Sequence, residues 1–163
     1  MKYVHSALIA LLVLLPAICE AKENCPWLNQ ATALGVLEVG TSSSPAAIVE
    51  VTATVCDFTY QDATGFRALR ISVEQSKDPS QTLKLRKTEC GSGASALPAI
   101  GNEAVMCLAG RKRRIDGEEV IGRVRDNVFT VRLLSKNGGP FMPRQALEEK
   151  TERVAEQVAG NLF

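Results

Sequence analysis

The clearest pattern of polar and apolar positions lies near the end of the chain and is helical. From residue 145 to residue 162, small or apolar side chains return every three or four positions: Leu147, Thr151, Val154, Ala155, Val158 and Leu162. Charged residues fill most of the remaining positions: Glu148, Glu149, Lys150, Glu152, Arg153 and Glu156. This pattern predicts an amphipathic helix that packs one stripe against a sheet.

Strict alternation predicts strands earlier in the chain. The Val- and Thr-rich residues 48–60 are expected to form one strand, and residues 69–73 a second. The polar residues 61–65 between them indicate a turn, so the two strands are expected to pair as a hairpin.

A second group of strands follows in the other half of the chain. Strands are expected over residues 103–108, 120–125 and 128–134. Asp126 and Asn127 are expected to form the two-residue turn of the last hairpin, because both tolerate positive φ. In its second strand Phe129, Val131 and Leu133 are expected on one face, with Thr130 and Arg132 on the other.

Two shorter helices complete the expected elements. Asn29 is placed to cap a helix over residues 30–34 that Gly35 ends, and Trp27 and Leu28 before it are available to the core. Asp78 followed by Pro79 predicts a helix that continues to residue 88. We therefore expect an α+β fold: an antiparallel sheet of about five strands with a short N-terminal, a middle and a long C-terminal helix packed on it.

Residues 1–21 have the pattern of a secretory signal peptide. Lys2 precedes an unbroken apolar run over residues 7–15, and Cys19-Glu20-Ala21 fits a cleavage site. The run is shorter than the roughly 20 apolar residues that span a bilayer. Ile18 stands where a lipoprotein signal normally has a small residue, so Cys19 is interpreted as part of the leader. We expect a secreted or periplasmic protein whose residues 22–163 form one domain, with no transmembrane segment after cleavage.

Composition narrows the chemistry of this domain. The chain has one histidine, His5, which lies in the leader. Without it, Ser-His-Asp and Cys-His mechanisms have no base that titrates near neutrality, and zinc loses its commonest catalytic ligand. The formal net charge of +1 gives no support to a nucleic-acid partner. No metal or cofactor is expected.

The four remaining cysteines are interpreted as disulfides, as is usual in an exported chain. Three pairings are open, and we favour the sequential one, Cys25–Cys56 with Cys90–Cys107. In the chain-entropy model each bond contributes about 3–4 kcal/mol. A zinc site of four thiolates is disfavoured because no C-x-x-C pair is present.

The order of landmarks resembles a family of exported bacterial domains of unknown function, common in actinobacterial lipoproteins. The similar pieces are Cys25-Pro26-Trp27-Leu28 before Gly35, Cys56-Asp57-Phe58 on a strand, residues 97–105 (LPAIGNEAV), the last hairpin and the closing helix. The resemblance implies a PsbP-like α/β/α sandwich. It implies no catalytic residues, and this chain departs from the family in lacking a lipobox.

Two segments are candidate binding sites. The run Arg111, Lys112, Arg113 and Arg114 suggests an anionic partner, although a solvated turn offset by nearby acids is the favoured interpretation. Gly101, Asn102 and Glu103 can hold a fixed tight loop, for which a structural turn is the favoured interpretation.

Three catalytic or phosphate-binding interpretations are possible, and none is favoured. Asp57 and Glu103 are the candidate carboxylate pair of a glycosidase-like site. Ser92 or Ser95 with Lys87 would need a desolvated lysine, which its polar neighbours do not suggest. The Gly-rich residues 91–95 lack the Gly-Lys-Ser/Thr ending of a phosphate-binding loop.

The sequence therefore predicts an exported, non-enzymatic binding domain of the bacterial cell envelope. Its partner is expected to be an envelope protein or a small ligand, and the domain itself a monomer. The alternatives are a carboxylate-dependent hydrolase of envelope polymers, which needs a deep cleft with two facing carboxylates, and a structural envelope component, which needs a large exposed apolar patch.

Overall fold

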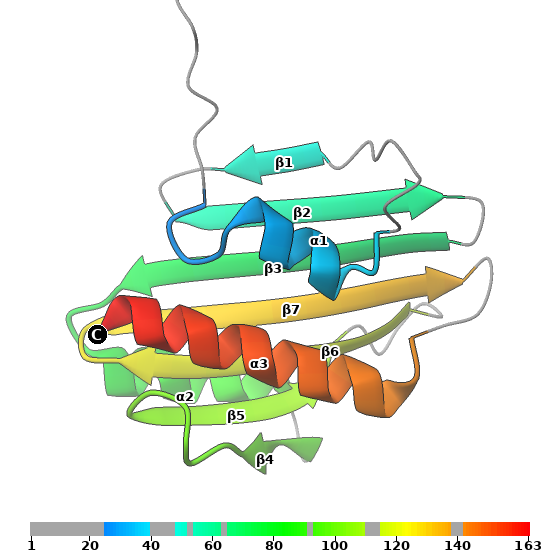
Figure 1. The fold of residues 1–163 in the computed structure, drawn as a ribbon. Coiled ribbons are helices and arrows are strands. Elements are labelled where there is room, and N and C mark those ends of the chain that lie inside the picture. Colours follow the sequence, from blue (N-terminus) through cyan, green and yellow to red (C-terminus); the bar gives the residue numbers. More distant parts are fainter. Residues whose placement is uncertain are drawn as a thin grey trace, which may run out of the picture.

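The structure, a computed structural model, is an antiparallel sheet with helices on both faces (Figure 1). It describes residues 25–39, 48–51, 54–62, 65–90, 93–109, 115–137 and 142–163, so the predicted leader lies outside the described residues. The helices are α1 (Gln30–Val36), α2 (Pro79–Cys90) and α3 (Arg144–Leu162). The strands are β1 (Ile48–Val51), β2 (Val55–Asp62), β3 (Gly65–Gln75), β4 (Ser95–Ala96), β5 (Glu103–Leu108), β6 (Ile115–Val124) and β7 (Asn127–Asn137).

The strands lie in the order β1-β2-β3-β7-β6-β5-β4, and every neighbouring pair is antiparallel. This confirms the α+β class. The sheet has seven strands where about five were expected, because β1 is a separate strand and the two-residue β4 adds a short edge.

The single strand expected over residues 48–60 is in fact two strands. Ile48 pairs with Thr59 and Val51 with Cys56, so the chain reverses between β1 and β2. The Val and Thr alternation fits either arrangement, since side chains alternate in the same way on both sides of a turn. The next hairpin, β2–β3, forms as predicted and closes where Asp62 pairs with Gly65.

The turn of the last hairpin lies one residue earlier than predicted. Arg125 and Asp126 form it, while Asn127 is already in β7 and pairs with Val124. The residue with positive φ is Arg125, at 53°. Its backbone conformation is fixed by a contact with the loop before β5, described below.

The main core lies between the sheet and helices α1 and α3 (Figure 1). The stripe predicted for the last helix is buried at Leu147, Thr151, Val154, Ala155 and Val158, with Ala159 added and Leu162 partly buried. It packs on β6 and β7. Trp27 and Leu28 are buried here as predicted.

Helix α1 is fixed at both ends by side chains. Asn29 caps it as predicted, accepting a hydrogen bond from the backbone N–H of Thr32 at 2.8 Å. Gly35 does not end it; the left-handed residue is Glu38, with φ of 54°. Lys150 and Arg67 donate to carbonyls at this C-terminal end, where the helix dipole favours cations.

Both disulfides have the predicted pairing. Cys25–Cys56 closes a loop of 31 residues, with an Sγ–Sγ distance of 2.14 Å, and joins the segment before α1 to β2. Cys90–Cys107 closes one of 17 residues, at 2.05 Å, and joins the end of α2 to β5. Because Cys56 lies in the main core and Cys107 in the small cluster under α2, each face of the sheet has one disulfide.

Helix α2 begins as predicted, with Asp78 accepting from the N–H of Gln81 at 2.9 Å, and runs two residues further than expected, to Cys90. Within the described ranges, none of the helices has the length and apolar character needed to cross a membrane.

Candidate functional site

The face of the sheet under α2 is only partly covered. Helix α2 packs on β5 and β6 through one small buried cluster: Leu83, Cys90, Val105, Cys107 and Ile121. The rest of this face, on β2, β3 and β7, has mainly polar side chains: Asp57, Arg70, Ser72, Glu74, Thr130 and Arg132. They occupy the positions that alternate with the core residues of the same strands, as predicted for Thr130 and Arg132.

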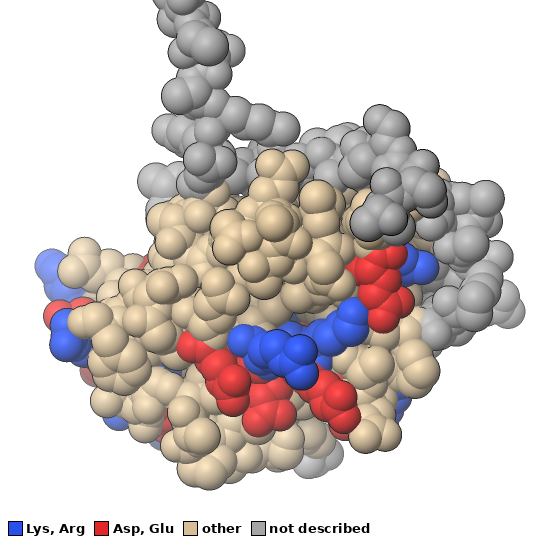
Figure 2. All heavy atoms as spheres, viewed as in Figure 1, with Lys and Arg blue, Asp and Glu red and all other residues tan. Residues whose placement is uncertain are grey.

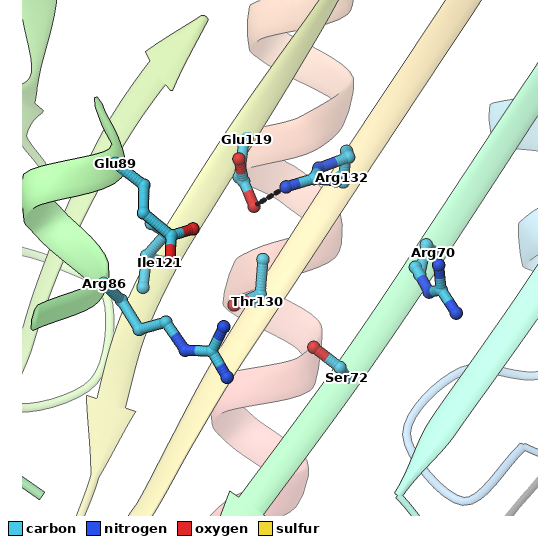
Figure 3. Close-up of a pocket in the computed structure, with 8 residues that line it drawn as sticks. All are labelled: Arg70, Ser72, Arg86, Glu89, Glu119, Ile121, Thr130 and Arg132. Carbon is cyan, nitrogen blue, oxygen red and sulfur yellow. Dashed lines mark hydrogen bonds and ion pairs between the residues drawn. The ribbon is translucent and has the colours of Figure 1, made fainter. Parts of the chain in front are cut away.

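A groove lies where α2 ends and this polar surface begins. One hollow of about 170 Å³ is lined by the residues of Figure 3: Arg70, Ser72, Arg86, Glu89, Glu119, Ile121, Thr130 and Arg132. A second of about 190 Å³ shares Ser72, Arg86 and Thr130 with it and extends toward Thr54, Val55, Glu74 and Val128. We call the two together the α2-side groove.

Two ion pairs of different strength border the groove. Arg132 donates from Nη2 to Oε1 of Glu119 at 2.7 Å, and Glu119 is only 7% exposed. Arg86 lies 3.4 Å from both carboxylate oxygens of Glu74, and both side chains are nearly half exposed. A loose, exposed pair of this kind contributes about 0–1 kcal/mol, so Arg86 is readily available to another acceptor.

The other charged groups of the groove differ in their partners. Arg70 points toward β2 (Figure 3), where it forms an ion pair with Asp57 at 3.2 Å. Glu89 has no hydrogen bond or ion pair to any side chain that the structure describes. Nε of Arg132 is buried and has no acceptor among the described residues. Buried donors are almost always satisfied in native proteins, so this N–H is a place where a further acceptor belongs.

Gly101 and Asn102, which were expected to form a tight loop, both contact the neighbouring β6–β7 turn in the structure. Asn102 accepts from the N–H of Arg125 at 2.7 Å and donates its own N–H to the carbonyl of Arg123 at 2.9 Å. Gly101 has φ of 61°, and a Cβ there would lie 2.5 Å from that same carbonyl. The loop therefore holds the β6–β7 turn, and neither residue lines the α2-side groove.

Glu103 is held by two cations. It accepts from Nζ of Lys87 at 2.8 Å and lies 3.8 Å from Nε of Arg123. The hydrogen bond from Lys87 lowers the pKa of this carboxyl below its ordinary value. An open hollow of about 300 Å³ lies beside it, lined by Ser80, Lys84, Lys87 and Glu103. Lys87 is therefore engaged as a hydrogen-bond donor to a carboxylate, and no contact between Lys87 and Ser95 is present among the described residues.

The candidate carboxylate pair is not brought together. Asp57 is on β2 and Glu103 on β5, with β3, β7 and β6 between them. Neighbouring strands lie about 4.8 Å apart, so the two positions are separated by about 19 Å. Glycosidase carboxylates lie roughly 5–9.5 Å apart. These two residues therefore cannot act on one glycosidic bond.

Two of the segments singled out lie outside the described residues. They are the basic run Arg111, Lys112, Arg113 and Arg114, and the start of the Gly-rich stretch, including Ser92. Within the described part of the chain, no three His, Cys, Asp or Glu side chains are grouped to hold a metal ion.

A buried carboxylate lies on the opposite face of the sheet, under the first turn of α3. Glu118 is 2% exposed, and its nearest cation is Arg144, whose Nε lies 3.5 Å away but donates to Glu148 at 2.8 Å. Burial raises the pKa of Glu118 to about 7. Glu118 was not predicted as a buried residue, because the strand containing it was expected to begin only at Val120.

The surface over α1 and α3 shows a short band of basic side chains with acidic ones on both sides (Figure 2). Several of these charges are paired, including Lys150 with Glu38 at 2.9 Å and Arg144 with Glu148 at 2.8 Å. The described residues of this face therefore offer no extended patch of one sign.

None of the residues that line the groove was among the candidate site residues predicted from the sequence, and those on α2 are Arg86 and Glu89. Their spacing of three places both on one side of α2, and this was the available signal. Their meeting with Arg132 depends on where α2 docks, which periodicity does not give. Comparison of the chain with models of protein families, with curated proteins and with solved structures finds no match.

Proposed function

We propose that this protein is an exported, non-enzymatic binding domain of the bacterial cell envelope, and that the α2-side groove receives its ligand. The observation that carries the proposal is the incomplete cover of one sheet face. Guanidinium, carboxylate and hydroxyl groups from β3, β6, β7 and α2 converge there on one groove. Convergent polar groups in a concavity are what orient and select a ligand.

Export is supported by the leader pattern and by the cysteines. All four cysteines outside the leader are paired in disulfides, which persist in oxidising compartments and are rare in the cytosol. The absence of histidine after His5 leaves this domain without the side chain most used in acid–base catalysis.

Binding is favoured over hydrolysis by the state of the acidic groups. Asp57, Glu74 and Glu119 each have a guanidinium partner, and Glu103 pairs with Lys87. Each of these carboxylates therefore faces a cation and not a second carboxylate, which a glycosidase-like site requires. The groove is also shallow, where a hydrolase of polymers needs a cleft with two facing carboxylates.

A purely structural role has less support. The exposed large apolar side chains among the described residues are Leu85, Leu108 and Phe163. They lie on α2, at the end of β5 and at the C-terminus, and Phe163 lies against the guanidinium of Arg125. Scattered single residues of this kind are normal on a monomer surface.

The experiment is sedimentation of the purified protein with isolated cell-envelope material. We expect the protein to sediment with it, and the variant Arg86→Ser/Glu89→Ser to stay in solution. Arg153→Ser, an exposed arginine on α3, is the matched control and should sediment normally. Equal sedimentation of the groove variant and the control would contradict the proposal. Release of soluble fragments from the envelope material, lost in the groove variant, would favour the hydrolase.

A further inference from the structure

The charges of the hollow in Figure 3 are complementary to a zwitterion. Arg86 and Glu89 extend from α2 over the sheet, on the side where Arg132 rises from β7. Arg132 is already committed to Glu119, and Arg86 only loosely to Glu74. The hollow therefore combines two guanidiniums with donors to spare and one carboxylate, Glu89, that has no partner among the described residues.

A ligand with a single charge would leave part of this set unsatisfied. An anion would place its charge beside the unpaired Glu89, and a cation would lie against two guanidiniums. A molecule with both a carboxylate and an ammonium group satisfies each side, and a carboxylate is the planar acceptor that guanidiniums bind best.

The volumes of the two hollows and the hydroxyl groups that line them agree with a small zwitterionic ligand. The two hollows measure about 170 and 190 Å³, which is below the roughly 300–1,000 Å³ typical of sites for drug-sized molecules. Ser72 and Thr130 contribute hydroxyls that can both donate and accept, which matches the C=O and N–H groups of a peptide bond.

We propose that the α2-side groove binds a zwitterionic molecule of amino-acid or dipeptide size, or the free end of such a peptide. Its carboxylate lies on Arg86 and Arg132, and its ammonium group on Glu89. This inference rests on the proposed function of the groove and specifies its ligand.

The test is isothermal titration calorimetry of the protein with three probes: L-alanyl-L-alanine, its N-acetyl form and its C-terminal amide. We expect the unmodified dipeptide to bind, and each blocked form to bind at least about tenfold more weakly, since each has lost one charged contact. Equal heats for all three probes, or no binding of the dipeptide up to about 10 mM, would overturn the inference.

Substitutions at two exposed positions on α2 test which residue binds which end of the ligand. Glu89→Gln should remove the preference for a free amino group and keep the preference for a free carboxylate, whereas Arg86→Gln should do the reverse. Arg153→Gln is the control and should leave all three affinities unchanged. Arg132→Gln is less informative, because it leaves the buried Glu119 unpaired and weakens the fold. Preferences unchanged in both α2 variants would contradict the assignment.

The titration with dipeptides tests the identity of the ligand separately from the proposed function of the groove. If the groove variant fails to sediment with envelope material but the dipeptide does not bind, the groove is the binding site and its ligand has another chemistry. If sedimentation does not depend on the groove, the proposed function itself fails.

Discussion

The two faces of the sheet differ in how completely helices cover them, although the same strands form both faces. On one face Phe129, Val131 and Leu133 lie fully buried under α3 and α1. On the other face their immediate neighbours Thr130 and Arg132 line an open groove, because α2 packs mainly over β5, β6 and part of β7 and leaves the rest uncovered. One face therefore supplies most of the stability, and the other keeps polar groups accessible.

This difference has a direct consequence for mutagenesis. Neighbouring residues on one strand should separate stability from binding, because alternate side chains face opposite sides of the sheet.

The largest contrast should be between Phe129 and Thr130. Phe129→Ala removes a fully buried ring and should lower the free energy of unfolding by about 3–5 kcal/mol. Thr130→Ala, on the groove floor, should cost less than about 1 kcal/mol. Urea denaturation followed by circular dichroism measures both free energies of unfolding. Similar decreases at the two positions would contradict the difference between the two faces.

The disulfides should contribute to both faces, with a slightly larger effect on the closed one. Replacing Cys25 and Cys56 by Ala releases the longer loop and should cost about 4 kcal/mol, against about 3 kcal/mol for Cys90 and Cys107. Only the second pair fastens α2, so its loss should weaken binding in the groove under conditions where the protein remains folded. Loss of groove binding after removal of the first pair alone would show that the faces are not independent.

Glu118 should make stability depend on pH. Its pKa is raised from 4.5 to about 7 by burial, so the folded state holds the proton more tightly than the unfolded state. The contribution of Glu118 to stability should therefore be greatest below about pH 4.5 and should be lost as the pH rises through about 7. Glu118→Gln should remove this loss and be more stable at pH 8 by up to about 3 kcal/mol. Thermal denaturation across this pH range measures it.

The matched control for that experiment is Glu156→Gln, an exposed carboxylate on the same face that should leave the pH profile unchanged. The stability difference between the wild-type protein and Glu118→Gln should change between pH 5 and pH 8. If that difference stays constant, Glu118 is not held in its protonated form.

The smallest effect on stability should come from the groove itself. Arg86→Ser removes one loose, exposed ion pair and should change the free energy of unfolding by less than about 0.5 kcal/mol. The same variant should lose ligand binding. A loss of stability comparable to that of a core variant would mean that Arg86 is a structural residue.

Local chemistry was sufficient to predict much of the scaffold. The stripe of α3, the caps at Asn29 and Asp78, and both disulfide pairs were predicted and are present. Each depends on spacing or residue type over a short stretch, or on having only four cysteines to pair.

Features set by contacts distant in sequence could not be predicted. The turn at Arg125 takes its register from Asn102, which is 23 residues away in the chain. The reversal between β1 and β2 leaves the pattern of alternation unchanged. The groove depends on how α2 docks, so Arg86 and Glu89 could be placed on one helix face but not beside Arg132.

The central claim is that ligands bind on the α2 side of the sheet. The most direct measurement is photo-crosslinking in living cells, with a photoreactive amino acid at position 54, which lines the groove, or at position 153 on α3, followed by intact-mass analysis of the purified protein. A covalent adduct formed from position 54 and absent from position 153 is the predicted result. Adducts from position 153 with none from position 54 would contradict the account.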